Sequence, residues 1–221
     1  MNQARREAYQ NLIESLLTCP SEQKIEILQA NLELIDDGFA QYLREWVTET
    51  LATLDAKQAY NCANFLFGLA ISFHELRQGS RTSNLEVVIA CLEIALTVVT
   101  REAYSKKWAM FQLGLGTFYV NRIRGKKADN LELAIAACDA SLEIYTRDAF
   151  PIDNAQTLYG LGVAYRDNSQ LPEAYNTFNS AIETMELMRS EIIIGGEADR
   201  QKLAEAWNKL DQALETVMRC G

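Results

Sequence analysis

The feature that most constrains this chain is an internal repeat, because well-separated landmarks recur at one constant offset. That offset is 46 residues, from 84 to 130, from 100 to 146 and from 114 to 160. A constant offset of this kind indicates a repeat architecture, in which each unit buries its apolar face against its neighbours. The recurring segments are Asn84–Glu86 with Asn130–Glu132, Thr100–Tyr104 with Thr146–Phe150, and Gly114–Gly116 with Gly160–Gly162.

The apolar residues inside each block fall three and four positions apart, as at Ile135, Cys138, Leu142 and Tyr145. This spacing is typical of an amphipathic α-helix, and each block is long enough for two helices. The β-branched run Ile192–Ile194 is short and lies inside the helical pattern. The sequence therefore predicts an all-α protein.

The third block carries the sharpest motif, which pairs small residues with aromatic ones. Small residues allow the two helices of a hairpin to approach each other, and aromatic rings fill the space beside them. The spacing resembles the tetratricopeptide repeat (TPR), with leucine where that motif prefers tryptophan. Its residues are Leu158, Leu161, Gly162, Tyr165, Ala174, Phe178 and Ala181.

The 46-residue period is interpreted as a 34-residue TPR unit with two lengthened loops. The step from Tyr119 to Ala134 is 15 residues, whereas the step from Tyr165 to Ala174 is 9. A degenerate first copy precedes these two blocks, so three copies meet the minimum for a stable stack. Its landmarks are Leu69, Ala70, Phe73, Val88, Leu92 and Ala95.

The resulting expectation is a right-handed superhelical TPR α-solenoid with an N-terminal helical module and a C-terminal capping helix. A dimer seam is the alternative for the C-terminal segment, since spacings of four and three also suit a coiled coil. Its apolar residues are Leu203, Trp207, Leu210, Leu214 and Val217. The expected boundaries are 1–57 for the module, 58–104, 105–150 and 151–194 for the repeats, and 195–221 for the cap.

Helix boundaries are predicted from breakers and capping residues. A first helix should stop near Pro20, a second should run from Ser21 to Ile35, and a third should reach Leu54. Two capping boxes are expected at matching sites of the repeat. These are Ser83 with Glu86 and Asp129 with Glu132.

The segments Arg122–Gly125, Asn130–Cys138 and Thr146–Pro151 resemble the long-loop TPR arrays of cyanobacterial proteins. Many proteins of that family end in a caspase-like CHAT peptidase domain, which has no counterpart in this chain. The resemblance implies a binding module or the regulatory arm of such a peptidase. It specifies the type of repeat and not the partner, because TPR proteins bind many partners.

The formal net charge is −9, and residues 1–57 hold 10 Asp/Glu against 5 Lys/Arg. An acidic chain repels phosphate backbones, so we expect no nucleic-acid partner. One local basic stretch could dock an acidic partner or could be an ordinary solvated loop. It contains Arg122, Arg124, Lys126 and Lys127.

No apolar run approaches the roughly 18 residues that suggest a membrane helix, so we expect a cytoplasmic protein with no membrane partner. The five cysteines are scattered and odd in number, which favours reduced thiols. Cys91 and Cys138 are interpreted as small apolar fillers of helix faces.

The sequence predicts no enzymatic activity, no catalytic residue, no cofactor and no metal site, since it carries none of the corresponding motifs. The single histidine, His74, lies twelve residues after Cys62 on the same predicted helix. That spacing corresponds to about 18 Å along a helix, which is too far for a cysteine–histidine catalytic pair.

The candidate binding surface is the concave face of the three leading helices, which in TPR proteins faces inward. Relatives often carry Asn-Asn-Leu-Gly-Asn where this chain has Gln112–Thr117 and Leu158–Val163. This departure leaves a largely apolar groove in place of asparagines that suit an extended peptide. The predicted groove residues are Asn64, Phe67, Ile71, His74, Met110, Leu113, Thr117, Val120, Gln156, Tyr159, Val163 and Arg166.

The principal functional hypothesis is a protein-interaction scaffold or adaptor that takes a partner helix or apolar segment, a protein or peptide, in this groove. The alternatives are a regulatory or sensor arm of a CHAT peptidase effector and a self-associating module. In the self-associating case the groove holds a second copy, as a homodimer. A further alternative fills the groove with the chain's own N-terminal module.

Overall fold

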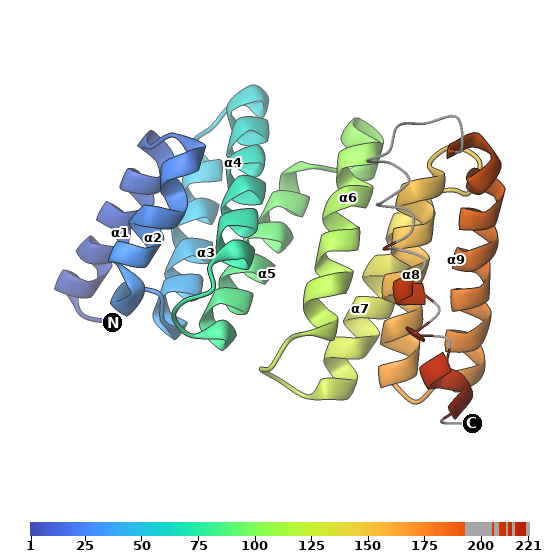
Figure 1. Cartoon of the computed structure of the whole chain (residues 1–221). Helices are drawn as coiled ribbons and strands as arrows, with labels where there is room; N and C mark the ends of the chain where they lie inside the picture. The colour runs from blue at the N-terminus through green and yellow to red at the C-terminus, as the bar shows by residue number, and fades with distance from the viewer. Residues whose placement is uncertain (193–204, 206–207, 211, 214, 220–221) are drawn as a thin grey trace. The chain divides into compact units, whose positions relative to one another are not determined.

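The computed structural model of the chain describes residues 1–192, 205, 208–210, 212–213 and 215–219 (Figure 1). These residues form helices and connections without any strand, which confirms the all-α prediction. The helices pack in neighbouring pairs, including α4 with α5, α7 with α8 and α8 with α9. The elements are α1 (Gln3–Thr18), η1 (Ser21–Gln23), α2 (Lys24–Ala30), η2 (Leu32–Leu34), α3 (Asp37–Leu51), α4 (Ala56–Glu75), α5 (Arg81–Val98), α6 (Arg101–Val120), α7 (Lys127–Leu142), α8 (Pro151–Asp167) and α9 (Leu171–Ile192).

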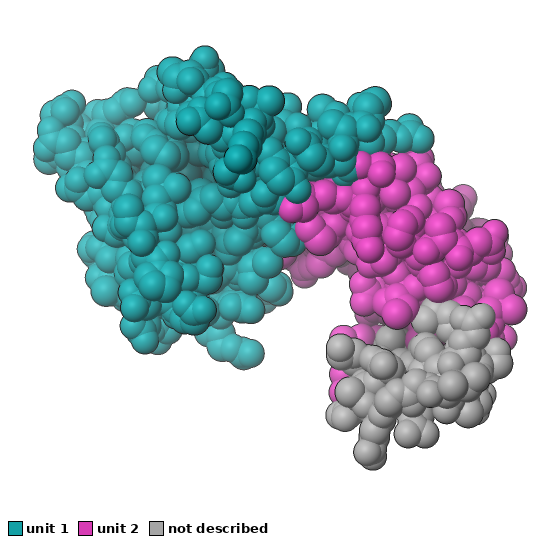
Figure 2. Space-filling model, turned by 90° about the horizontal axis from the view of Figure 1, so that it is seen from above, with its two compact units in different colours: residues 1–104, 122–124 teal, residues 105–121, 125–221 magenta. Residues whose placement is uncertain are grey.

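The chain divides into two compact units (Figure 2). Unit 1 comprises Met1–Tyr104 and Arg122–Arg124, and unit 2 comprises Ser105–Asn121 and Gly125–Gly221. Within unit 1, α3 packs on α5 and α2 packs on α4, so the N-terminal helices cover the first helix pair.

The second predicted helix is interrupted, which the sequence pattern did not indicate. A short 3₁₀ turn precedes α2, and α2 ends at Ala30, because Asn31 leaves the helical conformation and its side chain donates to the Ile27 carbonyl at 2.8 Å. An asparagine that binds the backbone of the last turn competes with helix continuation. The third helix, α3, ends at Leu51 and so falls short of Leu54.

Both predicted capping boxes are wrong, because α5 and α7 begin earlier than expected. Ser80 is the N-cap of α5, and its Oγ accepts from the Ser83 amide at 3.3 Å. The N-cap of α7 is Lys126. Each N-cap directly follows a glycine with positive φ, Gly79 at 81° and Gly125 at 79°, which turns the chain before the predicted cap is reached.

A capping box that the sequence analysis missed opens α4. The Asp55 carboxylate accepts from the Gln58 amide at 2.8 Å, and the Gln58 side chain accepts from the Asp55 amide at 3.0 Å. This arrangement satisfies two amides that the helix itself leaves unpaired. The signal was present in the sequence as aspartate followed three residues later by glutamine.

The 46-residue period is present in the backbone as well as in the sequence. Tyr104 (φ −143°, ψ 51°) forms a kink inside α6, and Phe150 (φ −143°, ψ 64°) is the N-cap of α8, so the same non-helical conformation recurs at equivalent positions. Before them, the hydroxyl oxygens of Thr100 and Thr146 each accept from the amide three residues later at 3.3 Å. The repeated Thr-Arg-(Glu/Asp)-Ala-(Tyr/Phe) sequence thus specifies the same turn twice, by the same hydrogen bonds.

Glycines of the leading helices allow close packing within unit 2. A Cβ placed on Gly162 would lie 2.5 Å from the Phe178 ring, and Phe178 is fully buried. A Cβ on Gly116 would lie 2.5 Å from the Cys138 sulfur. These two glycines occupy equivalent positions of the repeat. In each case the missing side chain allows close approach, of α6 to α7 and of α8 to α9.

The core of unit 2 extends into the C-terminal segment. Residues 208–210, 212–213 and 215–219 are helical, and Leu210, Ala213 and Val217 are buried with residues of α8 and α9. Their apolar face is therefore occupied within the chain, which favours the cap over a dimer seam for these residues. The other predicted members of this face, Leu203, Trp207 and Leu214, lie outside the described residues, as does the expected stop at 195–196.

We predict that Gly162→Ala destabilises the protein by about 1–3 kcal/mol relative to Gly160→Ala. Both changes replace a helical glycine and so gain similar helix propensity. The new methyl at 162 collides with the Phe178 ring, whereas that at 160 meets only the Cys138 sulfur at 3.6 Å. Urea unfolding of both variants measures the difference. Equal stabilities would contradict the close packing of α8 on α9.

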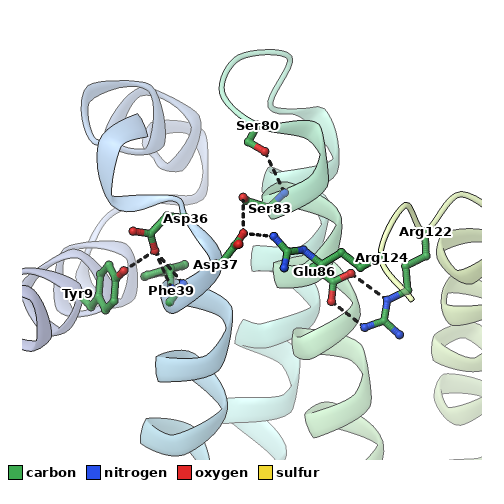
Figure 3. Close-up of polar contacts among 10 residues, drawn as sticks. Tyr9, Asp36, Asp37, Phe39, Ser80, Ser83, Glu86, Arg122 and Arg124 are labelled. Carbon is green, nitrogen blue, oxygen red and sulfur yellow. Dashed lines mark hydrogen bonds and ion pairs between the residues drawn. The ribbon is translucent and has the colours of Figure 1, made fainter. Parts of the chain in front are cut away.

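A second prediction concerns Asp36, whose carboxylate caps α3 and accepts from the Tyr9 hydroxyl (Figure 3). The same carboxylate forms an ion pair with Arg5. Burial by itself raises the pKa of Asp36, but the hydrogen bonds from Tyr9 and Arg5 outweigh it and lower the pKa below 3.8. The stabilisation is therefore present above pH 3.8 and is lost as the pH falls through the lowered value.

Asp36→Asn keeps a capping side chain and removes the charge, so we expect it to cost about 1 kcal/mol or less at pH 7, given the exposure of the pair. The gap between the two proteins should close below pH 3.8. Unfolding by urea across that pH range checks this, and a constant gap would contradict the role of the ionised carboxylate.

Candidate functional site

The predicted groove residues of α4 lie in unit 1 and form a partly exposed stripe. Ile71 and His74 are exposed, and Ile71 retains 43% of its accessible surface. Asn64 and Phe67 are half-buried. This stripe therefore offers an apolar side chain beside a histidine at the end of the helix.

The predicted groove residues of α6 differ among themselves in exposure. Thr117 is exposed, and Met110 and Leu113 are half-buried. Val120 is buried, and its carbonyl accepts from the Lys127 ammonium at 2.6 Å. The accessible part of the α6 stripe thus consists of the first three residues and excludes Val120.

The predicted groove residues of α8 include two that pack on the core. The Tyr159 ring lies 6.0 Å from the Phe178 ring, centroid to centroid, and Tyr159 and Val163 pack on the cluster that holds Phe178. Gln156 is exposed, and the half-buried Arg166 donates to the Asp167 carboxylate at 2.8 and 3.0 Å. Tyr159 and Val163 therefore serve packing as well as offering surface.

Two lysines join α6 to α8 within unit 2. Near the start of α6, the Lys106 ammonium lies 5.1 Å from the centre of the Phe150 ring, which precedes α8. At the other ends of these helices, Lys127 binds the Val120 carbonyl and lies 3.8 Å from the Asp167 carboxylate. The two leading helices of unit 2 are thereby held at both ends.

The middle of these helices is joined through Cys138 of α7. A Cβ on Gly116 of α6 would come within 2.5 Å of the Cys138 sulfur, and one on Gly160 of α8 within 3.6 Å. The same side chain therefore packs against a glycine of each leading helix. We call the accessible side chains of α6 and α8 the leading-helix face of unit 2, defined as Met110, Leu113, Thr117, Gln156, Tyr159, Val163 and Arg166.

The N-terminal module flanks the α4 stripe without covering its end. The Lys24 ammonium lies 5.0 Å from the centre of the Phe65 ring, and a Cβ on Gly68 would meet the same ammonium at 3.7 Å. Ile71 and His74, one and two turns further along α4, stay exposed. The alternative in which the module fills the groove thus receives no support at this part of unit 1.

The basic stretch is engaged within the protein. Arg122 forms two hydrogen bonds with the Glu86 carboxylate, both 2.8 Å, and Arg124 forms an ion pair with Asp37 (Figure 3). Lys127 binds Val120 and Asp167, as described above. Arg122, Arg124 and Lys127 are thus paired with groups of the chain itself, whereas the sequence analysis considered them only as solvated or as contacts for a partner.

The thiols show the environment expected of packing residues. Cys19, Cys62, Cys91 and Cys138 are free, and Cys91 and Cys138 are buried. Burial raises the pKa of Cys138 to about 12 and also raises the pKa values of Cys91 and Cys62. A nucleophilic cysteine requires the opposite shift, toward the thiolate. The filler interpretation of Cys91 and Cys138 agrees with this burial.

Among the described residues, no three His, Cys, Asp or Glu side chains are grouped so that they could hold a metal ion. None of the described helices combines the length and the apolar character required to cross a membrane.

Comparison with known proteins finds no family model, no curated protein and no solved structure that matches the chain. The TPR relationship and the resemblance to CHAT-associated arrays therefore stay predictions. The geometry of the described residues carries the functional argument.

For His74, we predict that replacement by alanine changes the free energy of unfolding by no more than about 0.5 kcal/mol, as expected of an exposed site. Thermal and urea unfolding provide the measurement. Phe73→Ala is the matched control on the same helix, because Phe73 is 1% exposed and its loss should cost about 3–5 kcal/mol. A large loss for His74→Ala would show that the imidazole is structural.

Proposed function

We propose that the chain is a TPR-type scaffold that binds an apolar or amphipathic helical segment of a partner protein. The observation that carries the proposal is the leading-helix face of unit 2, which combines half-buried apolar side chains with few charges. An amphipathic helix places apolar residues at intervals of three and four and can lay them along such a face.

Three features support the TPR part of the proposal. Gly162 and Phe178 pack against each other at the motif positions, and Ala174 and Ala181 are fully buried beside them. The backbone repeats its turn conformation after 46 residues, at Tyr104 and Phe150. Consecutive helices pack as pairs. Together these features fit a helical hairpin used repeatedly.

The preorganisation of the face supports binding. Lys106, Lys127 and Cys138 hold α6 and α8 together in the absence of a partner. Because this face is already formed, binding a partner costs little conformational entropy. More of the free energy of the contacts therefore contributes to affinity. The free thiols also fit a reducing compartment, and we place the protein in the cytoplasm.

The direct test replaces Thr117 and Gln156, the exposed members of the face, by arginine. Since both side chains are exposed, the double variant should fold as the parent does. It should also lose binding by roughly tenfold or more, because two charges would be desolvated in an apolar contact. The partner is captured from native lysate with the parent protein, identified, and then titrated against purified variants by calorimetry.

A matched control carries the same charge on another surface. Leu133→Arg changes a side chain of α7 that is 45% exposed and lies outside the leading-helix face. This control should bind the partner as the parent does. Full affinity of the Thr117/Gln156 variant, or equal loss in the Leu133 control, would reject the face as the binding site. Light scattering of the free parent decides whether a second copy occupies it.

A further inference from the structure

Residues 122–124 of the loop between α6 and α7 belong to unit 1, where their two arginines contact α3 and α5. Arg122 faces Glu86 of α5 in a two-pronged ion pair, Nε to Oε1 and Nη2 to Oε2, each 2.8 Å (Figure 3). Only 24% of the Arg122 side chain and 14% of the Glu86 side chain are accessible to solvent. Paired geometry of this kind gives a strong and directional interaction.

A second ion pair joins the same loop to another helix. Arg124 pairs with Asp37, the first residue of α3, and the Ser83 hydroxyl of α5 donates to the same carboxylate at 3.3 Å (Figure 3). The Arg124 and Asp37 side chains are 41% and 62% accessible. This outer pair is therefore screened by salt far more than the inner one.

The apolar residue between the two arginines does not anchor the loop, since Ile123 is 59% exposed. The two contacts that hold this segment on α3 and α5 are therefore charged rather than apolar. Asp37 lies within residues 1–57, which carry twice as many acidic as basic side chains. Glu86 lies on α5, the helix on which α3 packs. Two positive charges at the starts of α3 and α5 offset part of that excess.

We propose that residues 122–124 form an electrostatic strap, a loop held reversibly across the starts of α3 and α5 by the pairs Arg122–Glu86 and Arg124–Asp37. The shielded inner pair supplies most of the holding energy, and the exposed outer pair opens first as salt rises. When the strap opens, both guanidinium groups become accessible to solvent. The proposal is independent of the leading-helix face and of any partner.

Trypsin provides the test, because it cleaves after arginine only where the chain can leave the surface of the protein. The variants Glu86→Gln and Asp37→Asn remove the acceptor charges and preserve both cleavage sites. The rate of cleavage after Arg122 and Arg124 is followed by mass spectrometry and divided by the rate after Arg77. Arg77 lies in the connection between α4 and α5, which is the equivalent connection of the preceding repeat.

We expect Glu86→Gln to raise this cleavage ratio by about tenfold or more. The variant loses a charge-assisted interaction, and a loss of that strength changes an equilibrium by about this factor. Asp37→Asn should raise the ratio less, because the outer pair is exposed. In the parent protein the ratio should rise between about 0.05 M and 1 M NaCl, and the double variant should show a smaller rise.

Two outcomes overturn the strap. The first is that, in low salt, the parent protein and the double variant show the same cleavage ratio. The other is a ratio in the parent that does not change with salt. The salt series uses only the parent protein, so it decides the question even where a variant unfolds and is cleaved everywhere.

Discussion

The structure depends on the close approach of paired helices, which glycine makes possible. Gly162 leaves room for the Phe178 ring, and Gly116 leaves room for the Cys138 sulfur. A side chain at either glycine would push its helix away and open a gap that no neighbouring residue fills, since interiors are packed to nearly crystalline density. The stacking of leading and trailing helices within unit 2 follows from these contacts, because Cys138 meets glycines of both α6 and α8.

The second organising force is charge, which acts at the start of α3. The start of α3 is held by Asp36, which caps the helix and binds Arg5 and Tyr9. Its neighbour Asp37 is bound by Arg124. Arg5 and Arg124 thus lie beside carboxylates at the start of α3. Negative side chains there also match the positive end of the helix dipole.

Close helix packing and ion pairing hold different parts of the molecule. Contacts of the first kind are insensitive to salt, whereas ion pairs weaken as salt rises. The leading-helix face of unit 2 rests on buried packing and is held by contacts at both ends of its helices. The strap at residues 122–124 rests on ion pairs that salt weakens. Binding and conformational response would therefore reside in different parts of the chain, and either could be altered without the other.

The sequence alone determined the all-helical class, the repeat and the packing positions of Gly162 and Phe178. These are local or periodic properties, because helical spacing and the need for a small residue opposite a ring are written in neighbouring positions. The repeated turn at Tyr104 and Phe150 also follows from local hydrogen bonds of the preceding threonines.

Other features were decided only by tertiary structure. The capping boxes at Ser83 and Asp129 failed because Gly79 and Gly125 turn the chain earlier, and the sequence pattern does not give their φ angles. The burial of Val120 and the partners of Arg122 and Arg124 could not be predicted, because they depend on which helices meet across more than 30 residues of chain. A charged side chain has the same sequence signature whether it is solvated or paired, and only the fold decides which carboxylate lies within its reach.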